Sequence, residues 1–310
     1  MEPISAAVPP GWPAVTQDEA VFPTAARVAA ALRTVGYLPD TAIASTVFLA
    51  GRLGKPVLVE GPAGTGKTEL AKSVALATGA RLIRLQCYEG LDEAKALYEW
   101  NYRKQLLRLQ AAQGAASDAA DEWGRLHDDL FGESFLLSRP LLEAIRAPEP
   151  VVLLIDEVDR LDVETEALLL EVLSDYQVSI PELGTVTASR IPRVFLTSNS
   201  SRELSEALKR RCLYLHLGYP TPEREREIVL ARVPGIPEHL AGQIAQVVQT
   251  LRGLELRKRP SVSESLDWAR TLLVLGVQDI EAGLLTDTMN VLLKNHHDIA
   301  LAIKELAVPD

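Results

Sequence analysis

The chain has 310 residues, of which 47% are hydrophobic and 24% charged, with a formal net charge of −10 and a pI near 5.2. This length suits one large α/β domain with a smaller helical one, and the acidic balance disfavours nucleic acid as a partner because phosphate binding needs basic excess. Two cysteines exclude a disulfide framework, and the apolar runs are shorter than the roughly 20 residues that span a membrane. The start has no secretory signal, so we expect a cytoplasmic protein.

The chain is expected to begin with an arm and a helix over residues 1–40. Residues 8–13 are rich in proline, which fixes φ and removes backbone donors, so this stretch is predicted to be extended. A helix is predicted over residues 25–35. We therefore treat residues 1–40 as a segment that precedes the main domain.

Strands and helices alternate from residue 57, which predicts βαβ units and a parallel sheet. Five strands are predicted, at residues 57–60, 81–86, 151–156, 193–197 and 213–217. After residue 220 only helical periodicity remains, with helices at 222–232, 239–251, 262–275 and 281–293. The expected division is an α/β core over 41–218, with an insert at about 90–145, and a helical lid domain over 219–310.

The insert separates the second predicted strand from the third, and it is far longer than an ordinary βα connection. It therefore holds further elements, among them a helix predicted over 97–113. Tyr98, Trp100 and Tyr102 cluster there. They form either a surface that contacts client proteins or an aromatic patch packed under the insert.

A phosphate-binding loop follows the first predicted strand and precedes a helix, which is the context that this motif requires. It matches the pattern G-x-x-x-x-G-K-[ST] with Gly61, Pro62, Ala63, Gly64, Thr65, Gly66, Lys67 and Thr68. The glycines let backbone N–H groups point at phosphates, and the helix N-terminus adds positive potential. Lys67 is expected to reach the β and γ phosphates of ATP, and Thr68 to ligate Mg²⁺. Glu69, in the first turn, is included in the predicted nucleotide site.

Two carboxylates end the apolar strand 151–156. Asp156 is expected to hold the Mg²⁺ shell and Glu157 to polarise the attacking water. Without the phosphate loop, these residues would equally suit a solvated acidic turn. Asn199 ends the fourth strand, where its amide could place the water or contact the γ-phosphate, although many strands end in Asn for turn reasons.

Arg210 and Arg211 stand just before the fifth strand. One reading is a solvated helix C-terminus that the helix dipole favours. The other is an arginine finger that stabilises phosphoryl transfer in a neighbouring subunit. Motif position favours Arg211 over Arg210 as the finger.

In their order along the chain, these motifs resemble the AAA+ ATPases. Within them the chain is similar to MoxR-type ATPases of the helix-2-insert group, through residues 156–160 and the helix over 168–178 that leads into a hairpin. Residues 87–92 and 98–102 resemble the branch associated with CO dehydrogenase maturation. The resemblance covers about residues 40–300. It implies an α/β core with strand order 5-1-4-3-2 and a homo-oligomeric, hexameric ring.

The resemblance also implies a chaperone that uses ATP and Mg²⁺ and acts on a client metalloenzyme, assisting metal-cofactor maturation. It further implies a partner with a von Willebrand factor A domain. In similar proteins the hairpin over 178–186 faces the central pore, so Leu183 at its tip is a candidate client contact. A plain surface hairpin is the alternative reading.

The chain departs from the family at the lid arginine called sensor 2. The best-matching position is Ser263, so either Arg257 or Arg259 replaces that arginine or the lid couples differently to nucleotide.

Three rival functions are a P-loop small-molecule kinase, a DNA-associated AAA+ loader and a nucleotide-gated binding module with little hydrolysis. The helical lid and Arg210–Arg211 disfavour the kinase, and the acidic balance disfavours the loader. Glu157 disfavours the module that only binds nucleotide.

Overall fold

Two compact units make up the chain. The computed structural model describes residues 22–112 and 130–306. The first unit contains Pro39–Val59 and Ala71–Leu215 together with the helix that precedes them. The second contains Gly36–Leu38, Glu60–Leu70 and the chain from His216 onward. The predicted extended arm at residues 8–13 lies outside the described residues.

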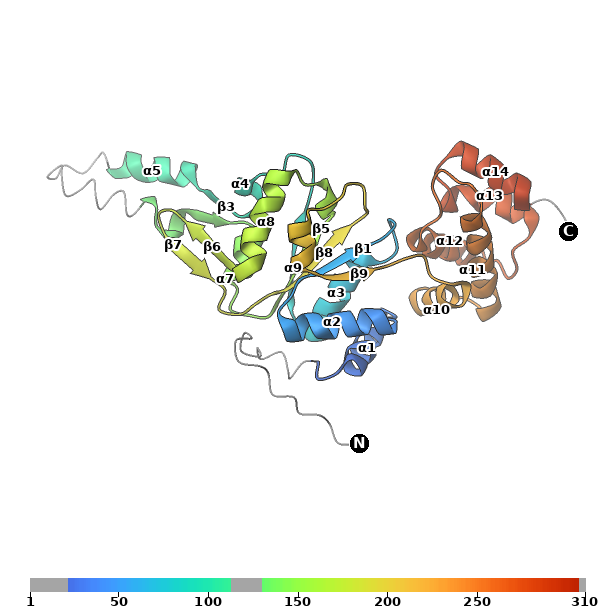
Figure 1. Cartoon of the computed structure of the whole chain (residues 1–310). Coiled ribbons are helices and arrows are strands. Elements are labelled where there is room, and N and C mark those ends of the chain that lie inside the picture. The colour runs from blue at the N-terminus through green and yellow to red at the C-terminus, as the bar shows by residue number, and fades with distance from the viewer. Residues whose placement is uncertain (1–21, 113–129, 307–310) are drawn as a thin grey trace, which may run out of the picture. The chain divides into compact units, whose positions relative to one another are not determined.

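A five-stranded parallel sheet forms the centre of the first unit (Figure 1). Its strands are β1 (Val57–Glu60), β2 (Arg81–Gln86), β5 (Val151–Asp156), β8 (Arg193–Ser198) and β9 (Leu213–His216). Each predicted strand is present, with its ends within one residue of the prediction. The observed order, β2-β5-β8-β1-β9, is the expected 5-1-4-3-2 when the five strands are numbered along the chain. The fold class is therefore confirmed.

Strand β5 is buried along its whole length. It pairs in parallel with β2 on one side and with β8 on the other, so that Ile155 lies opposite Leu85 and Leu196. A strand covered on both faces reads as a continuous apolar run, which is the pattern that predicted it.

Helices α1 (Ala25–Thr34), α2 (Thr41–Leu53), α3 (Lys67–Thr78), α8 (Val163–Asp175) and α9 (Glu206–Arg211) accompany the sheet. Helix α1 matches the helix predicted over 25–35, whereas α2 was not predicted. The sequence nevertheless carries both signals for α2. Asp40 caps its first turn by accepting a bond from the Ile43 N–H at 2.7 Å, and Gly54 ends it with a φ of 60°.

The insert differs from its prediction. It contains α4 (Glu93–Ala96), β3 (Tyr98–Trp100), α5 (Tyr102–Ala112), the 3₁₀ turn η2 (Glu133–Phe135), β4 (Leu136–Ser138) and α7 (Pro140–Arg146). The helix predicted over 97–113 was wrong at its start, because residues 98–100 pair antiparallel with β4 instead, with Trp100 opposite Leu136. Residue 113 lies outside the described residues. Trp100 is buried against Phe131 with the ring centroids 5.3 Å apart, whereas Tyr102 is exposed.

The predicted hairpin is present as β6 (Gln177–Ile180) and β7 (Gly184–Thr187). It follows α8 directly, after Tyr176 ends that helix with a φ of 50°. Leu183, in its turn, is partly buried and packs against the core of the first unit. In Figure 1 the hairpin and α5 lie at the same end of this unit.

The second unit is helical after β9. Its helices are α10 (Pro222–Arg232), α11 (Glu238–Gly253), α12 (Val262–Val274), α13 (Ala282–Leu292) and α14 (His296–Leu306). The first four were predicted, and α14 was missed. Trp268 of α12 is fully buried in their core and donates its indole N–H to Thr288 at 2.9 Å. Within the described residues, no helix combines the length and apolarity needed to cross a membrane.

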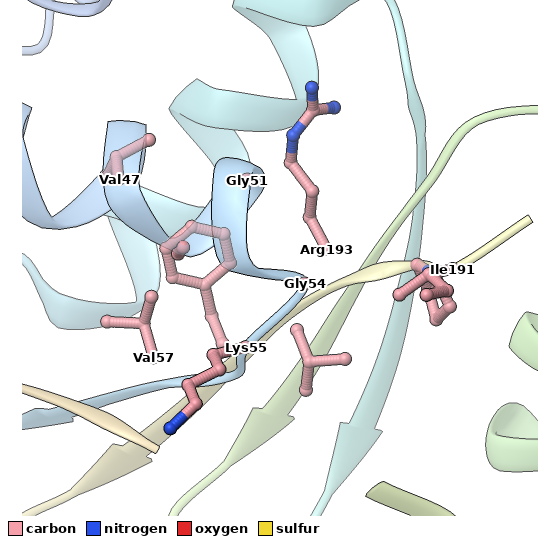
Figure 2. A pocket seen from close by; sticks show the side chains of 11 residues that line it. Val47, Gly51, Gly54, Lys55, Val57, Ile191 and Arg193 are labelled. Carbon is pink, nitrogen blue, oxygen red and sulfur yellow. The ribbon is translucent and has the colours of Figure 1, made fainter. Parts of the chain in front are cut away.

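A small pocket lies at the amino end of the sheet in the first unit (Figure 2). Val47, Val57 and Ile191 line it together with Lys55 and Arg193. Since β1 and β8 begin here, the pocket lies at the amino ends of the strands. The phosphate-binding loop leaves β1 at the opposite, carboxyl end. The pocket is therefore not the predicted nucleotide site.

Arg252 and Glu225 form a buried ion pair in the second unit. The two side chains make two hydrogen bonds with each other, one of them 2.9 Å long, and the Arg252 Nε also donates to the Pro260 carbonyl at 2.9 Å. The guanidinium lies 4.6 Å from the ring centroid of Tyr219. This pair therefore joins α10, α11, the chain before α12 and the segment that enters the second unit.

We expect Arg252→Met to lower the free energy of unfolding by about 3–5 kcal/mol, because it leaves a buried carboxylate without its partner. Arg252→Met combined with Glu225→Met should recover most of this loss. Arg226→Met is the matched control, since its ion pair with Glu238 is exposed and is worth about 0–1 kcal/mol. Urea unfolding measures all three; equal losses in the buried and exposed variants would contradict this account.

Candidate functional site

The loop over Gly61–Thr68 joins β1 to α3 and has the backbone conformation of a phosphate cradle. Gly64 and Gly66 have φ values of +73° and +96°, which favour glycine. Gly61 has a φ of +154°, and a Cβ there would overlap the Leu217 carbonyl oxygen. Successive N–H groups in such a loop form a concave nest for an anion.

Lys67 is buried in this loop, with 6% of its surface exposed. Its Nζ donates to the carbonyls of Gly61 at 2.8 Å and Pro62 at 2.7 Å, and the Thr65 hydroxyl also donates to Pro62, at 2.9 Å. Helix α3 begins at Lys67, so its first N–H groups face the same loop. The ammonium and the helix N-terminus together give positive potential where the motif predicts phosphate.

Glu69 was included in the predicted nucleotide site. Its carboxylate pairs with Arg232 of α10, with Oε1 2.9 Å from Nη2, and its place in the nucleotide site stays a prediction. What Glu69 can offer a nucleotide is therefore its backbone N–H in the first turn of α3. Thr68, one residue earlier, carries the hydroxyl suited to a magnesium ion.

The start of α12 lies beside the phosphate-binding loop within the second unit. A Cβ at Gly64 would overlap Ser261, which caps α12, and would lie 3.6 Å from the Ser263 hydroxyl. Arg257 is exposed, as is Arg259, and the Arg257 backbone N–H donates to Asp298 at 3.0 Å. Serines rather than an arginine thus stand next to Gly64.

Asp156 ends β5 and is buried, with 3% of its surface exposed. Its Oδ1 accepts a hydrogen bond from the Thr197 hydroxyl at 2.5 Å, and its Oδ2 lies 2.5 Å from the Arg84 guanidinium. A buried carboxylate needs such partners to remain charged. Thr197, in β8, also accepts the Glu157 N–H at 2.9 Å, so one hydroxyl joins both acidic residues.

Glu157 adopts the left-handed conformation, with a φ of 58°. Non-glycine residues rarely take this conformation, and they do so mainly where the surroundings impose it. The Glu157 carboxylate accepts from the Gln86 amide at 3.3 Å and lies 3.3 Å from the Arg160 Nε. It is partly exposed, which is compatible with the predicted contact with water.

Asn199 directly follows β8, and its backbone N–H donates to the buried Asp159 at 3.2 Å. Asp159 also accepts the N–H of Ser201 at 3.0 Å and its hydroxyl at 2.6 Å. Burial opposes ionisation of Asp159, but the hydrogen bonds from Ser201 and Asn199 outweigh it and lower the pKa of this carboxyl. Asp159 therefore stays charged and holds the turn that carries Asn199.

Arg210 and Arg211 are the last two residues of α9, and both are exposed. The Arg211 Nε donates to the Ser174 hydroxyl of α8 at 2.6 Å. Within the described residues, Arg210 has no hydrogen-bond or ion-pair partner. Neither arginine joins the group formed by Asp156, Glu157 and Thr197.

The sheet order relates the predicted groups to one another. The phosphate-binding loop follows β1, Asn199 follows β8 and Glu157 follows β5, and these three strands are neighbours. In parallel sheets, ligands bind outside the carboxyl ends of the strands. Sequence reasoning missed Thr197, Arg84 and Asp159. Thr197 and Asp159 each lie two residues from a residue that was predicted, Asn199 and Glu157 respectively, whereas Arg84 lies near none of the predicted residues and had no such signal.

A family model describing the AAA domain of the dynein-related subfamily matches residues 56–212, which is half of the chain. The chain belongs to this family. The match covers four of the five strands of the sheet and ends just before β9. It also contains the phosphate-binding loop and the predicted site residues Asp156, Glu157, Asn199, Arg210 and Arg211.

Two relatives are similar to parts of this chain. Midasin of Dictyostelium discoideum is 27% identical over 206 residues, which are 64% of this chain but 3% of midasin. The denitrification regulatory protein NirQ of Stutzerimonas stutzeri is 24% identical over 239 residues, which are 74% of each protein. The chain thus spans a small part of midasin and about three quarters of NirQ.

Among solved structures, a mutant of Thermotoga maritima RuvB has a TM-score of 0.47 and 20% identity, over 86% of this chain and 70% of RuvB. A second RuvB structure from that organism has a TM-score of 0.44 and 18% identity, over 88% and 70%.

The residues of this AAA domain suit magnesium. Mg²⁺ binds hard oxygen donors, usually one or two from the protein with the rest from phosphates and water. The Thr68 hydroxyl and the buried Asp156 carboxylate are donors of this kind. That these two residues hold the ion stays a prediction.

Thr197→Val should lower ATP turnover about 10- to 100-fold, because a displacement of about 1 Å at a catalytic group costs that much. Valine keeps the shape but removes the bonds to Asp156 and to the Glu157 N–H. Nucleotide affinity should change little. Thr187→Val, at an exposed position on β7, is the matched control. Turnover equal in the two variants would show that the Thr197 hydroxyl does not position Glu157.

Proposed function

We propose that this AAA domain binds ATP with Mg²⁺ and hydrolyses it to ADP and phosphate. The observation that carries the proposal is the Thr197 hydroxyl, which joins the buried Asp156 to the backbone of Glu157. A solvated acidic turn would need neither the buried carboxylate nor the left-handed Glu157.

Each residue has one role in this reaction. Lys67 and the N–H groups of the loop bind the phosphates; a bound Mg²⁺, held by Thr68 and Asp156, would supply charge neutralisation there. Glu157 accepts a proton from water while the water oxygen bonds to the γ-phosphorus. The bond from that phosphorus to the β–γ bridging oxygen breaks, and the electron pair remains on ADP. The Asn199 amide orients the water.

Arg210 and Arg211 are proposed to act on the nucleotide of a neighbouring subunit. Both are exposed at the end of α9, and neither contacts the Asp156–Glu157 group of its own chain. An arginine supplied to phosphoryl transfer raises the rate by about 10³–10⁵. A homo-oligomeric ring, a hexamer by resemblance to the MoxR type, would bring each pair to the next site.

The work done with ATP is proposed to be the remodelling of another protein in the cytoplasm. By resemblance to the MoxR type and its CO dehydrogenase branch, the client is a metalloenzyme whose cofactor is being installed. A von Willebrand factor A domain protein is the expected partner. The relative NirQ is named a denitrification regulatory protein, which is compatible with this proposal. The exposed Tyr102 and the hairpin turn at Leu183 are the candidate client contacts.

At the lid, Ser261 and Ser263 are proposed to take the place of the sensor 2 arginine. This proposal rests on their position beside Gly64, while the Arg257 backbone is bonded elsewhere.

Lys67→Ala should abolish ATP binding, because it removes the one buried cation of the phosphate loop. Lys72→Ala is the control, a lysine of the same helix outside the loop. Equilibrium binding of a fluorescent ATP analogue measures both variants. Unchanged affinity in Lys67→Ala would falsify the phosphate-loop assignment.

ATP turnover per subunit should rise steeply with protein concentration and then saturate, because each site needs a neighbour's arginine. Glu157→Gln should bind ATP and not hydrolyse it. Sizing at the lowest concentration accompanies the measurement. An active monomer there would overturn the ring and favour the small-molecule kinase.

A further inference from the structure

Helix α9 carries the arginine pair and is held at both ends by one neighbouring helix, α8. Its beginning is held by Glu166 and its end by Ser174. These two residues of α8 are eight positions apart, or about two helical turns. Both helices belong to the first unit.

Glu166 is almost fully buried, with 2% of its surface exposed. Its Oε1 accepts the backbone N–H of Ser205 at 2.7 Å, and its Oε2 accepts from the Arg202 guanidinium at 2.7 Å. Ser205 is the residue that caps α9, because its hydroxyl accepts the Leu208 N–H at 3.3 Å. Glu166 thus fixes the point in space where α9 starts.

Ser174 lies in the last turn of α8 and accepts a hydrogen bond from the Arg211 Nε at 2.6 Å. It fixes the direction in which the Arg211 side chain leaves α9. Arg210 is adjacent in sequence and exposed, and the same two anchors fix the place of its backbone.

A buried carboxylate is costly unless it is paired, and an apolar side chain often serves stability equally well. What the Glu166 carboxylate adds is specificity of position. It makes two directed bonds at one residue of α8, and these set the register between the helices. Turns and short helices without such bonds have several near-equivalent placements.

We propose that Glu166 is a positioning residue for the arginine pair, which it directs toward the nucleotide of the neighbouring subunit. The proposal rests on the proposed ring. Asn199, in the same connection, is held by a different carboxylate, Asp159. Loss of the Glu166 charge should therefore misplace the arginines that act on the neighbouring subunit. The subunit's own nucleotide site should remain intact.

Glu166→Gln alone should lower ATP turnover about 10- to 100-fold, the cost of a misplacement of about 1 Å. Its affinity for a fluorescent ATP analogue should be unchanged. Glu164→Gln is the matched control, an exposed carboxylate of the same helix, and it should behave as the wild type.

Mixing subunits separates positioning from structural damage. Glu157→Gln subunits cannot hydrolyse ATP but keep their arginines, whereas Glu166→Gln subunits keep their own site. An equal mixture should regain about a quarter of wild-type turnover, since random assembly of identical interfaces joins an intact site to intact arginines at about one interface in four. Neither variant alone should reach this rate.

The double variant Arg210→Ala with Arg211→Ala, mixed with Glu157→Gln in the same way, tests the ring itself. If that mixture regains turnover and the Glu166→Gln mixture does not, the role proposed for Glu166 is wrong and the ring stands. If the arginine mixture regains nothing, the ring with arginines supplied between subunits is wrong. Wild-type turnover in Glu166→Gln alone would also overturn the inference.

Ser174→Ala extends the test should Glu166→Gln fail to fold. It removes the bond to Arg211 without leaving a buried charge. Turnover should fall several-fold and be regained on mixing with Glu157→Gln, and no change in turnover would count against the double anchorage of α9.

Discussion

The buried carboxylate of Asp156 constrains everything around it. It ends a strand whose six residues are all buried, and burying a polar group costs free energy unless hydrogen bonds compensate for it. The donors here are the Thr197 hydroxyl from one neighbouring strand and the Arg84 guanidinium from the other. The two carboxylate oxygens of Asp156 therefore join three strands of the sheet. The Thr197 hydroxyl also accepts the backbone N–H of Glu157.

Two further buried carboxylates, which follow β5 in the chain, also hold backbone segments in place by hydrogen bonds. Asp159 holds the turn that carries Asn199, and Glu166 holds the start of α9. Burial opposes ionisation of both, yet hydrogen bonds from Ser201 to Asp159 and from Ser205 to Glu166 outweigh it and lower their pKa values. The connection between β8 and β9 is thus positioned by charge at two places rather than by apolar packing alone.

Much of the fold could be predicted because its signals are local. Apolar runs marked the five strands, and helical periodicity marked four of the helices after residue 220. The order of the strands came from resemblance. The helix predicted over 97–113 was wrong at its start because β3 pairs with β4, and Tyr98 lies opposite Ser138. A pairing between residues so far apart leaves no mark in either segment read alone.

For the candidate site, motif spacing named the residues that are predicted to contact a nucleotide and missed the residues that hydrogen-bond to them. Thr197 and Glu166 act through bonds to residues about 40 positions away in sequence, so no short pattern contains both partners. An interior threonine or glutamate is also compatible with ordinary packing. Only the three-dimensional structure distinguishes a residue that positions another by hydrogen bonds from one that merely packs.

The junction between α8 and the hairpin has a mechanical consequence. Helix α8 carries both anchors of α9, and it passes into β6 through the single residue Tyr176. That residue takes a left-handed conformation, and its hydroxyl donates to the Gly54 carbonyl at 3.0 Å, at the end of α2. A load applied to the hairpin would therefore be divided between two helices before it reached the arginines. Tyr176 therefore ties the hairpin to α2 as well as to α8, so that a displacement of the hairpin is not passed to α9 through α8 alone.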